Sequence, residues 1–147
     1  APDCRPSAIL HPVAALLRVG LIQALGFTGK IMSNFGKSIE PHVSNEIAMF
    51  QRDQIGGFKH LERAHVIGQE STVQHVRVHW HMLLFSLRTR NPHEAFGQMF
   101  RIAGAATKTA IGLVPKGNTG GSDISPFKKL PIPADLQEII DSAKRQT

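Results

Sequence analysis

Apolar residues recur at helical spacing in successive segments of this chain, and this pattern constrains it to an all-α fold. The clearest stripe is Ile39, Val43, Ile47 and Phe50. A later segment is apolar almost all round, as expected for a central helix. We predict four helices, over residues 39–52, 58–68, 73–88 and 92–110.

Proline and glycine mark several of the predicted helix ends. Pro41 falls in the first turn of the first helix, where proline is tolerated. Gly68 suits a C-terminal end. Asn91 and Pro92 form a clear start signal, with asparagine as the N-cap and proline at the first helical position.

An internal repeat suggests how the four helices pack. Residues 52–64 resemble residues 90–102, with arginine, phenylalanine and a second arginine at matching positions. Repeats built from helical hairpins are typical of tetratricopeptide-like units, but two units are too few for a free-standing array. We expect a compact bundle of two tetratricopeptide-like hairpins. A Gly/Pro-rich strap over 113–133 and a short helix over 134–143 follow it.

The chain divides into an N-terminal extension, 1–31, and a helical domain, 32–147. The extension is predicted to be an amphipathic helix packed on the domain, or a non-native stretch preceding a natural start at Met32. No run of eighteen apolar residues appears, so no membrane partner is expected. The single cysteine, Cys4, rules out an intrachain disulfide and fits a cytoplasmic location.

Basic residues exceed acidic ones, with a formal net charge of +6. This balance favours acidic partners, including nucleic acid, yet the charges are scattered and a solvated surface is the better default. Nucleic-acid binding would need four arginines on one face: Arg77, Arg88, Arg90 and Arg101. Nucleic-acid binding is less favoured than the two functional hypotheses given below, a metal-binding protein and an adaptor.

Histidine is unusually frequent, at eight residues, and five lie between positions 60 and 81. On a helical wheel Glu62, His65 and Gln69 share the core-facing side of the second helix. His75 and His79 are four residues apart on the third, and the short connection makes the two helices antiparallel neighbours.

These spacings bring one carboxylate and three imidazoles toward a single point. Glu62, His65, His75 and His79 are therefore candidate ligands for a transition metal such as zinc, iron or copper. The alternative is a buried hydrogen-bond network in which Gln69 closes the helix end. The zinc-protease arrangement HExxH is absent, so no catalytic residue is assigned.

The glycine-rich stretch 116–122 contains a lysine and invites comparison with phosphate-binding loops. Such loops follow a strand and end in GK[ST] at the start of a helix. Here a helix precedes the stretch and a proline-rich segment follows it. We interpret it as a structural turn.

Five strings in order along the chain carry a family resemblance: HLERAHVIGQ, HVRVHWHML, GQMFRI, VPKGNTGG and LPIPADL. Over residues 39–143 the chain resembles the bacterial family called domain of unknown function 3703. The resemblance implies a small helical domain and carries over no catalytic residue. The matching strings contain all the candidate ligands.

The leading functional hypothesis is a non-enzymatic helical adaptor that holds a peptide or protein partner, since the sequence shows a repeat and no catalytic set. The runner-up is a metal-binding accessory protein that uses the Glu/His cluster. Gln69, Arg77 and Arg101 are further candidate binding residues. A homodimer is left open.

Overall fold

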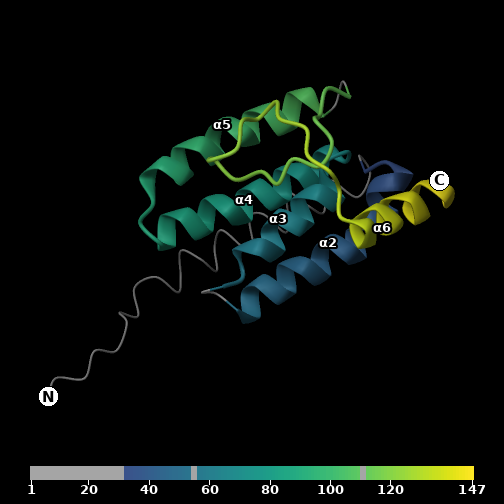
Figure 1. Cartoon of the computed structure of the whole chain (residues 1–147), viewed down its shortest axis with the longest axis horizontal. Coiled ribbons are helices and arrows are strands. Elements are labelled where there is room, and N and C mark those ends of the chain that lie inside the picture. Colours follow the sequence, from purple (N-terminus) through teal and green to yellow (C-terminus); the bar gives the residue numbers. More distant parts are fainter. Residues whose placement is uncertain (1–31, 54–55, 110–111) are drawn as a thin grey trace, which may run out of the picture. The chain divides into compact units, whose positions relative to one another are not determined.

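The computed structural model describes residues 32–53, 56–109 and 112–147, and this part of the chain contains helices and no strand. The helices are α2 (Asn34–Arg52), α3 (Phe58–Gly68), α4 (Thr72–Arg88), α5 (Pro92–Lys108) and α6 (Ala134–Arg145), as shown in Figure 1. The expected all-α class is confirmed. The predicted N-terminal extension lies outside the described residues.

The first described helix begins earlier than its apolar stripe predicts. The Ser33 hydroxyl accepts a hydrogen bond from the Gly36 amide at 3.1 Å, which caps the helix there. Pro41 consequently lies inside α2, and the prediction that it occupies the first turn is wrong. The apolar periodicity locates the buried face, whereas the cap upstream of it decides where the helix starts.

The start of α5 follows its sequence signal. The side chain of Asn91 accepts a hydrogen bond from the Glu94 amide at 3.0 Å, and Pro92 takes the first helical position. The short helix near the C-terminus is also present, and α6 extends to Arg145. The predicted ends at Gly68 and Arg88 are confirmed.

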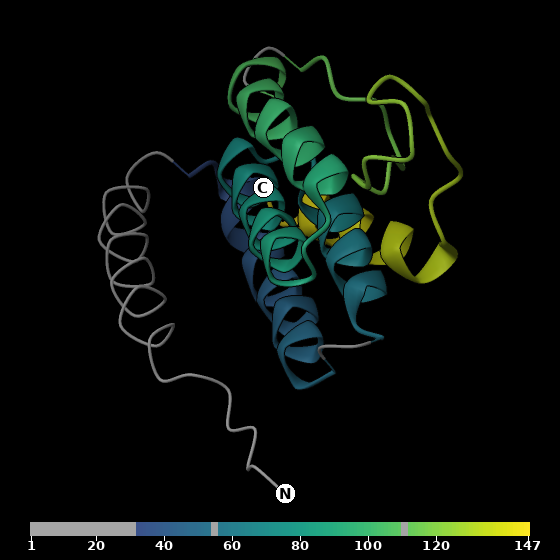
Figure 2. The same ribbon diagram turned by 90° about the vertical axis from the view of Figure 1, so that its left-hand side faces the viewer.

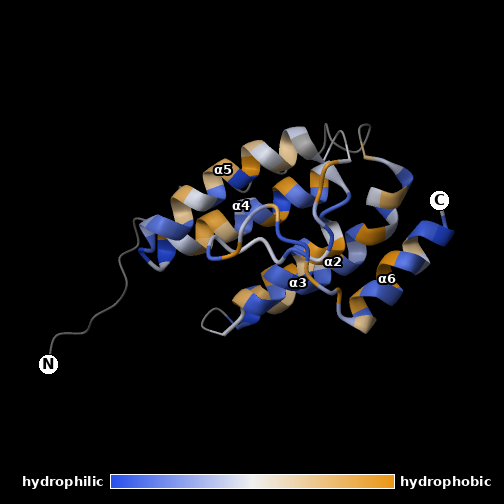
Figure 3. Ribbon diagram, turned by 45° about the horizontal axis from the view of Figure 1, so that its top comes forward, coloured by the Kyte–Doolittle hydropathy of each residue, from blue (hydrophilic) through white to orange (hydrophobic). Residues whose placement is uncertain are grey.

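Successive helices pack against one another: α2 on α3, α3 on α4 and α4 on α5, while α6 returns to cover α2 and α3 (Figure 2). Polar and apolar residues alternate along each helix, as Figure 3 shows, so each has one face to bury. The core formed by these faces is almost entirely aliphatic: Ile39, Val43, Ile47, Phe50, Leu61, Ala64, Val66, Ile67, Val78, Met82, Leu136, Ile140 and Ala143.

Residues 112–133, called here the C-terminal loop, run beside α5 before reaching α6 (Figures 1 and 2). Asn118 holds this loop together from within. Its side-chain amide donates to the carbonyl oxygens of Ser125 and Lys128, both at 2.9 Å, and its side-chain oxygen accepts from the Gly120 amide. These bonds fix the course of the loop although it has no regular secondary structure.

Among the described residues, no helix combines the length and apolar character that a membrane crossing requires.

Candidate metal centre

Three buried histidines converge where α3, α4 and the C-terminal loop meet. The Nε2 atom of His65 lies 2.8 Å from that of His75 and 3.1 Å from that of His79. The remaining pair, His75 and His79, is separated by 3.2 Å. The predicted convergence of these imidazoles is present, and among the described residues they form the group suited to holding a metal ion.

The helices explain why the rings meet. His75 and His79 are one turn apart on α4, so their side chains project from the same face. His65 comes from the last turn of α3, and a tight turn in which the Ser71 amide donates to the Gly68 carbonyl brings α4 alongside. The site is therefore built on two rigid elements joined by a short connection.

Each ring makes a hydrogen bond through its other nitrogen, Nδ1. His65 Nδ1 lies 2.7 Å from the carbonyl oxygen of Asn118, and His75 Nδ1 lies 2.7 Å from the Thr109 hydroxyl. His79 Nδ1 lies 2.6 Å from Oε1 of Gln98. Second partners of this kind orient metal-binding histidines and set which nitrogen carries the proton.

Two of these contacts determine which ring nitrogen carries the proton in His65 and in His79. A carbonyl oxygen only accepts, so His65 Nδ1 must be the donor. The Gln98 amide nitrogen is committed to Glu94 Oε1 at 2.6 Å and to the Gly120 carbonyl at 2.9 Å, so its oxygen faces His79 as an acceptor. The Nε2 atoms of neutral His65 and His79 are therefore lone-pair acceptors pointing at each other.

The surroundings keep the imidazoles uncharged. Burial lowers the pKa of His75 to about 4 and that of His79 to about 3, and it lowers the pKa of His65 well below the usual range. The positive charge of Arg101 acts in the same direction on the pKa of all three rings. Neutral imidazole is the form that binds a metal.

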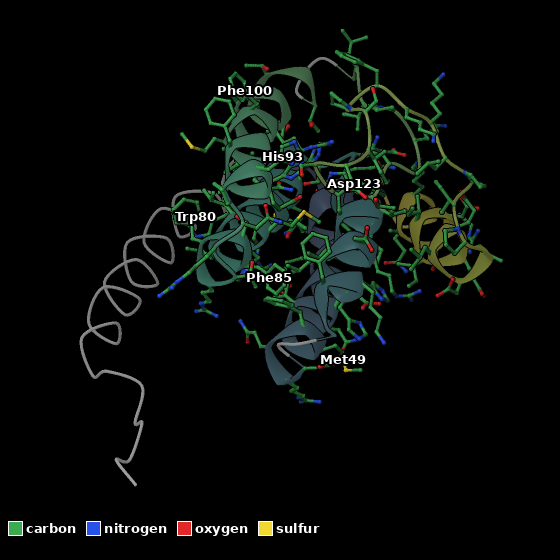
Figure 4. All side chains as sticks on the ribbon, turned by 60° about the vertical axis from the view of Figure 1, so that its left-hand side comes forward. Met49, Trp80, Phe85, His93, Phe100 and Asp123 are labelled. Atoms are coloured by element: carbon green, nitrogen blue, oxygen red, sulfur yellow. The ribbon has the colours of Figure 1, made fainter. Side chains whose placement is uncertain are left out.

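A pocket of about 420 Å³ adjoins the three rings, which form part of its wall. Small residues of α5, Gly97, Gly104 and Ala105, line one side. The pocket is also lined by Phe100 of α5, which Figure 4 labels. Its apolar lining from the C-terminal loop is Leu113, Val114, Pro115 and Pro126.

Glu62, the predicted carboxylate ligand, lies outside the histidine group. It is half-buried beside the C-terminal loop. Burial is the main reason why the pKa of its carboxyl is raised, while the Thr119 side chain lowers it and the charges of Asp123 and Glu94 raise it. The structure thus brings together three of the four predicted ligands.

Two further candidates, Gln69 and Arg77, have internal partners. Gln69 is 1% exposed. With its amide oriented to satisfy both groups, it donates to the Pro115 carbonyl at 3.2 Å and accepts from the Gly117 amide at 2.9 Å. Arg77 donates to Glu40 on α2, at 3.2 Å. Gln69 therefore anchors the C-terminal loop, and Arg77 links α4 to α2.

Arg101 lines the pocket together with the three histidines. Its Nη2 atom donates to the carbonyl oxygens of Gly121 and Ile124, which ties the C-terminal loop to α5. Burial lowers the pKa of its guanidinium, and the charges of Glu94 and Asp123 raise it. An arginine remains protonated under such conditions, so the pocket contains a fixed positive charge.

The sequence pattern does not identify the partners of the three rings, which are Gln98, Thr109 and Asn118. Gln98 is fully buried on α5, and a polar residue on the inner face of a helix is a signal that could have identified it. Asn118 acts on His65 through its main-chain carbonyl, which no side-chain pattern reveals. The stretch around it, interpreted as a structural turn, also forms part of the site.

Gly120 shows how closely the C-terminal loop approaches His65. Its backbone φ is +84°, and a Cβ atom placed on it would lie 2.7 Å from the Cδ2 atom of the His65 ring. Only glycine combines that conformation with this close contact.

No curated protein and no solved structure matches the chain. The model of one family, described as "Protein of unknown function (DUF3703)", matches residues 37–140, which is most of the chain and includes all three histidines. The chain therefore belongs to the family of domain of unknown function 3703.

Proposed function

We propose that this protein binds one transition metal ion through His65, His75 and His79, with zinc as the ion that best fits the geometry. The observation that carries the proposal is the 3.1 Å separation of the His65 and His79 Nε2 atoms. Both rings donate from Nδ1, so these nitrogens face each other as two acceptors. Acceptors at that distance repel unless a cation lies between them.

The three nitrogen separations support a tetrahedral ion. A zinc ion with bonds of about 2.0–2.1 Å to imidazole nitrogens has ligand–ligand distances of about 3.3 Å. The observed distances are 2.8, 3.1 and 3.2 Å. An ion bonded equally to all three would lie about 1 Å from their plane, leaving a fourth position for water or a ligand.

A hydrogen-bond network without metal explains the arrangement less well. If Thr109 donates to Nδ1 of His75, that ring can donate from its own Nε2 and satisfy one neighbour. The other acceptor then needs a second proton in the cluster. This would create an imidazolium ion, which burial disfavours, since it lowers the pKa of all three rings.

Metal binding can be tested on protein without a histidine tag. Titration with Zn²⁺ against a chromophoric chelator should show one equivalent bound, together with a higher melting temperature, because an ion that binds the folded state stabilises it. His75→Asn should lower the affinity at least a hundredfold while circular dichroism shows an intact helical fold. His42→Asn, which changes an exposed histidine on α2, is the matched control. A folded wild-type protein that binds no Zn²⁺ would refute the proposal.

The adaptor role on a tetratricopeptide-like surface is the second candidate. The observation that favours it is the exposure of large apolar side chains on α5, where Phe96, Met99 and Phe100 are 62%, 58% and 67% exposed. Sedimentation of the wild type and of Phe96→Ser would test whether a second copy of the chain covers them. A cytoplasmic location remains a prediction.

Nucleic-acid binding has less support from the described contacts. Arg77 and Arg101, two of the four arginines that it requires, donate to oxygen atoms within the chain. Arg77 is held against α2 and Arg101 lines the pocket beside the C-terminal loop, so the described contacts do not place the two on one common face.

A further inference from the structure

We propose that the fourth position of the metal site binds the carboxylate of a small organic acid whose apolar part occupies the adjoining pocket. The inference rests on the proposed metal-binding function and adds the class of ligand. Three features of the site support it: the charge that the ligand set leaves on the ion, the guanidinium of Arg101, and the apolar wall opposite.

The ligand set leaves the charge of a divalent ion uncompensated. All three ligands are neutral imidazoles, and no carboxylate belongs to the group among the described residues. A divalent ion held in this way keeps its two positive charges in a buried environment, where electrostatic interactions are stronger than in water. An anion at the fourth position reduces this charge, and a neutral molecule does not.

Arg101 adds a further positive charge to the same pocket. The ion pairs formed by the described arginines and lysines join Arg63, Arg77 and Lys144 to carboxylates, and Arg101 is not among them. Its described hydrogen bonds go from Nη2 to two carbonyl oxygens. The guanidinium therefore retains donors for a carboxylate, which it binds with matching geometry.

The rest of the pocket suits a hydrocarbon group. Leu113, Val114 and Pro115 line it from the C-terminal loop, and Ala105 lines it from α5. Leu113 is 66% exposed, so an apolar ligand would cover surface that water now contacts. A volume of about 420 Å³ lies within the range of small-molecule sites. Charge at one end and an apolar wall beyond it together favour a monocarboxylate over an inorganic anion.

The test uses protein loaded with Co²⁺, whose visible absorption reports the coordination of the ion. Hexanoate should change the spectrum and saturate, hexanamide should not, and acetate should bind at least tenfold more weakly than hexanoate. Arg101→Gln should weaken hexanoate at least tenfold. Circular dichroism and Co²⁺ content should show the helical fold and the metal site of the wild type, a check that is needed because glutamine is too short to reproduce the bonds from Nη2 to the loop carbonyls.

A second variant tests the apolar wall without touching the helices. Leu113→Ser should weaken hexanoate severalfold and leave acetate unchanged. Met99→Ser changes a similarly exposed side chain on α5 outside the pocket lining, and it should alter neither. If hexanoate leaves the Co²⁺ spectrum unchanged, or if acetate binds as tightly as hexanoate, the inference about the ligand is overturned while the metal site stands. Failure to bind Co²⁺ at all would overturn the metal site as well.

Discussion

Gln98 accepts a hydrogen bond from His79 at 2.6 Å while its own amide nitrogen donates to Glu94 and to the Gly120 carbonyl. One buried side chain on α5 thus orients an imidazole on α4 and holds the C-terminal loop. Because the amide nitrogen of Gln98 is already donating, its oxygen faces His79 and can only accept, so His79 carries its proton on Nδ1. The Nε2 atom of His79 is therefore unprotonated and points toward the other two rings.

Replacing Gln98 with Leu should weaken metal binding without removing any ligand. Loss of a second partner of this kind typically lowers metal affinity by about 10–100-fold, because the ring loses both its orientation and part of its basicity. Chelator competition would measure the affinity. Gln51→Leu, on an exposed position of α2, is the control and should leave the affinity unchanged. Equal affinity in Gln98→Leu and wild type would show that the contact has no influence on the site.

Gly120 offers a test of the contact between the C-terminal loop and His65. Gly120→Ala introduces a side chain at φ +84° and only 2.7 Å from the His65 ring. We expect a loss of about 1–3 kcal/mol in the free energy of unfolding, together with weaker metal binding, because the backbone is strained and the ring is displaced. Urea denaturation of the apo-protein and Zn²⁺ titration would measure the two effects.

The matched control is Gly104→Ala on α5, where an added Cβ would meet nothing within 4 Å beyond its chain neighbours and its own helix backbone. Alanine is the better helix former by about 1 kcal/mol, so this variant should be as stable as the wild type or more so. If both glycine variants were equally stable, the close approach to His65 would not constrain the loop.

The sequence predicts the elements of this fold and the convergence of three of the four candidate ligands, because these depend on local periodicity. The i, i+4 spacing of His75 and His79 places them on one face, and the short connection after Gly68 brings α3 alongside. The departure is at Glu62. A helical wheel places it near His65, but the histidine group does not include its carboxylate, which lies beside the C-terminal loop.

The periodicity of the sequence does not predict the position of the C-terminal loop. Its contact with His65 is made by the main-chain carbonyl of Asn118, and its course depends on hydrogen bonds within the loop and on Gln69. Such contacts depend on the backbone geometry of residues that can be far apart in the sequence, as His65 and Asn118 are. The pocket beside the histidines has the same origin, since one of its walls is formed by this loop.

Glu46 allows the scaffold to be tested separately from the metal site. This carboxylate, 8% exposed on α2, accepts from Arg63 at 2.7 Å and from His60 at 2.6 Å, both on α3. Glu46→Ala should lower the free energy of unfolding by about 1–3 kcal/mol, since its partners lose a nearly buried acceptor. Metal affinity should stay at the wild-type value. Glu138→Ala, at an exposed position of α6, should change neither quantity.

The histidine cluster should make the metal-free protein sensitive to mild acid. In the unfolded chain histidine has a pKa near 6.5. In the folded state the pKa is about 4 for His75 and about 3 for His79, and that of His65 is also far below its usual range. Between these values the unfolded chain binds more protons than the folded one, so stability rises with pH. The stability that the neutral histidines contribute is fully present above about pH 6.5. It is lost progressively as the pH falls toward the pKa values of the folded state.

Urea denaturation at pH 7.5, 6.5, 5.5 and 5.0 would measure this dependence, and His75→Asn supplies the comparison. Each proton that only the unfolded state binds lowers the free energy of unfolding by about 1.4 kcal/mol per pH unit. As the pH falls over this range, the free energy of unfolding of the wild type should therefore decrease more steeply than that of His75→Asn. The difference in slope should be at most about 1.4 kcal/mol per pH unit, the value for one proton. His42→Asn should follow the wild type, because that exposed side chain lies outside the cluster. Parallel profiles for His75→Asn and wild type would mean that the buried ring is protonated as readily as in the unfolded chain. That result would contradict the neutral cluster on which the proposed metal binding depends.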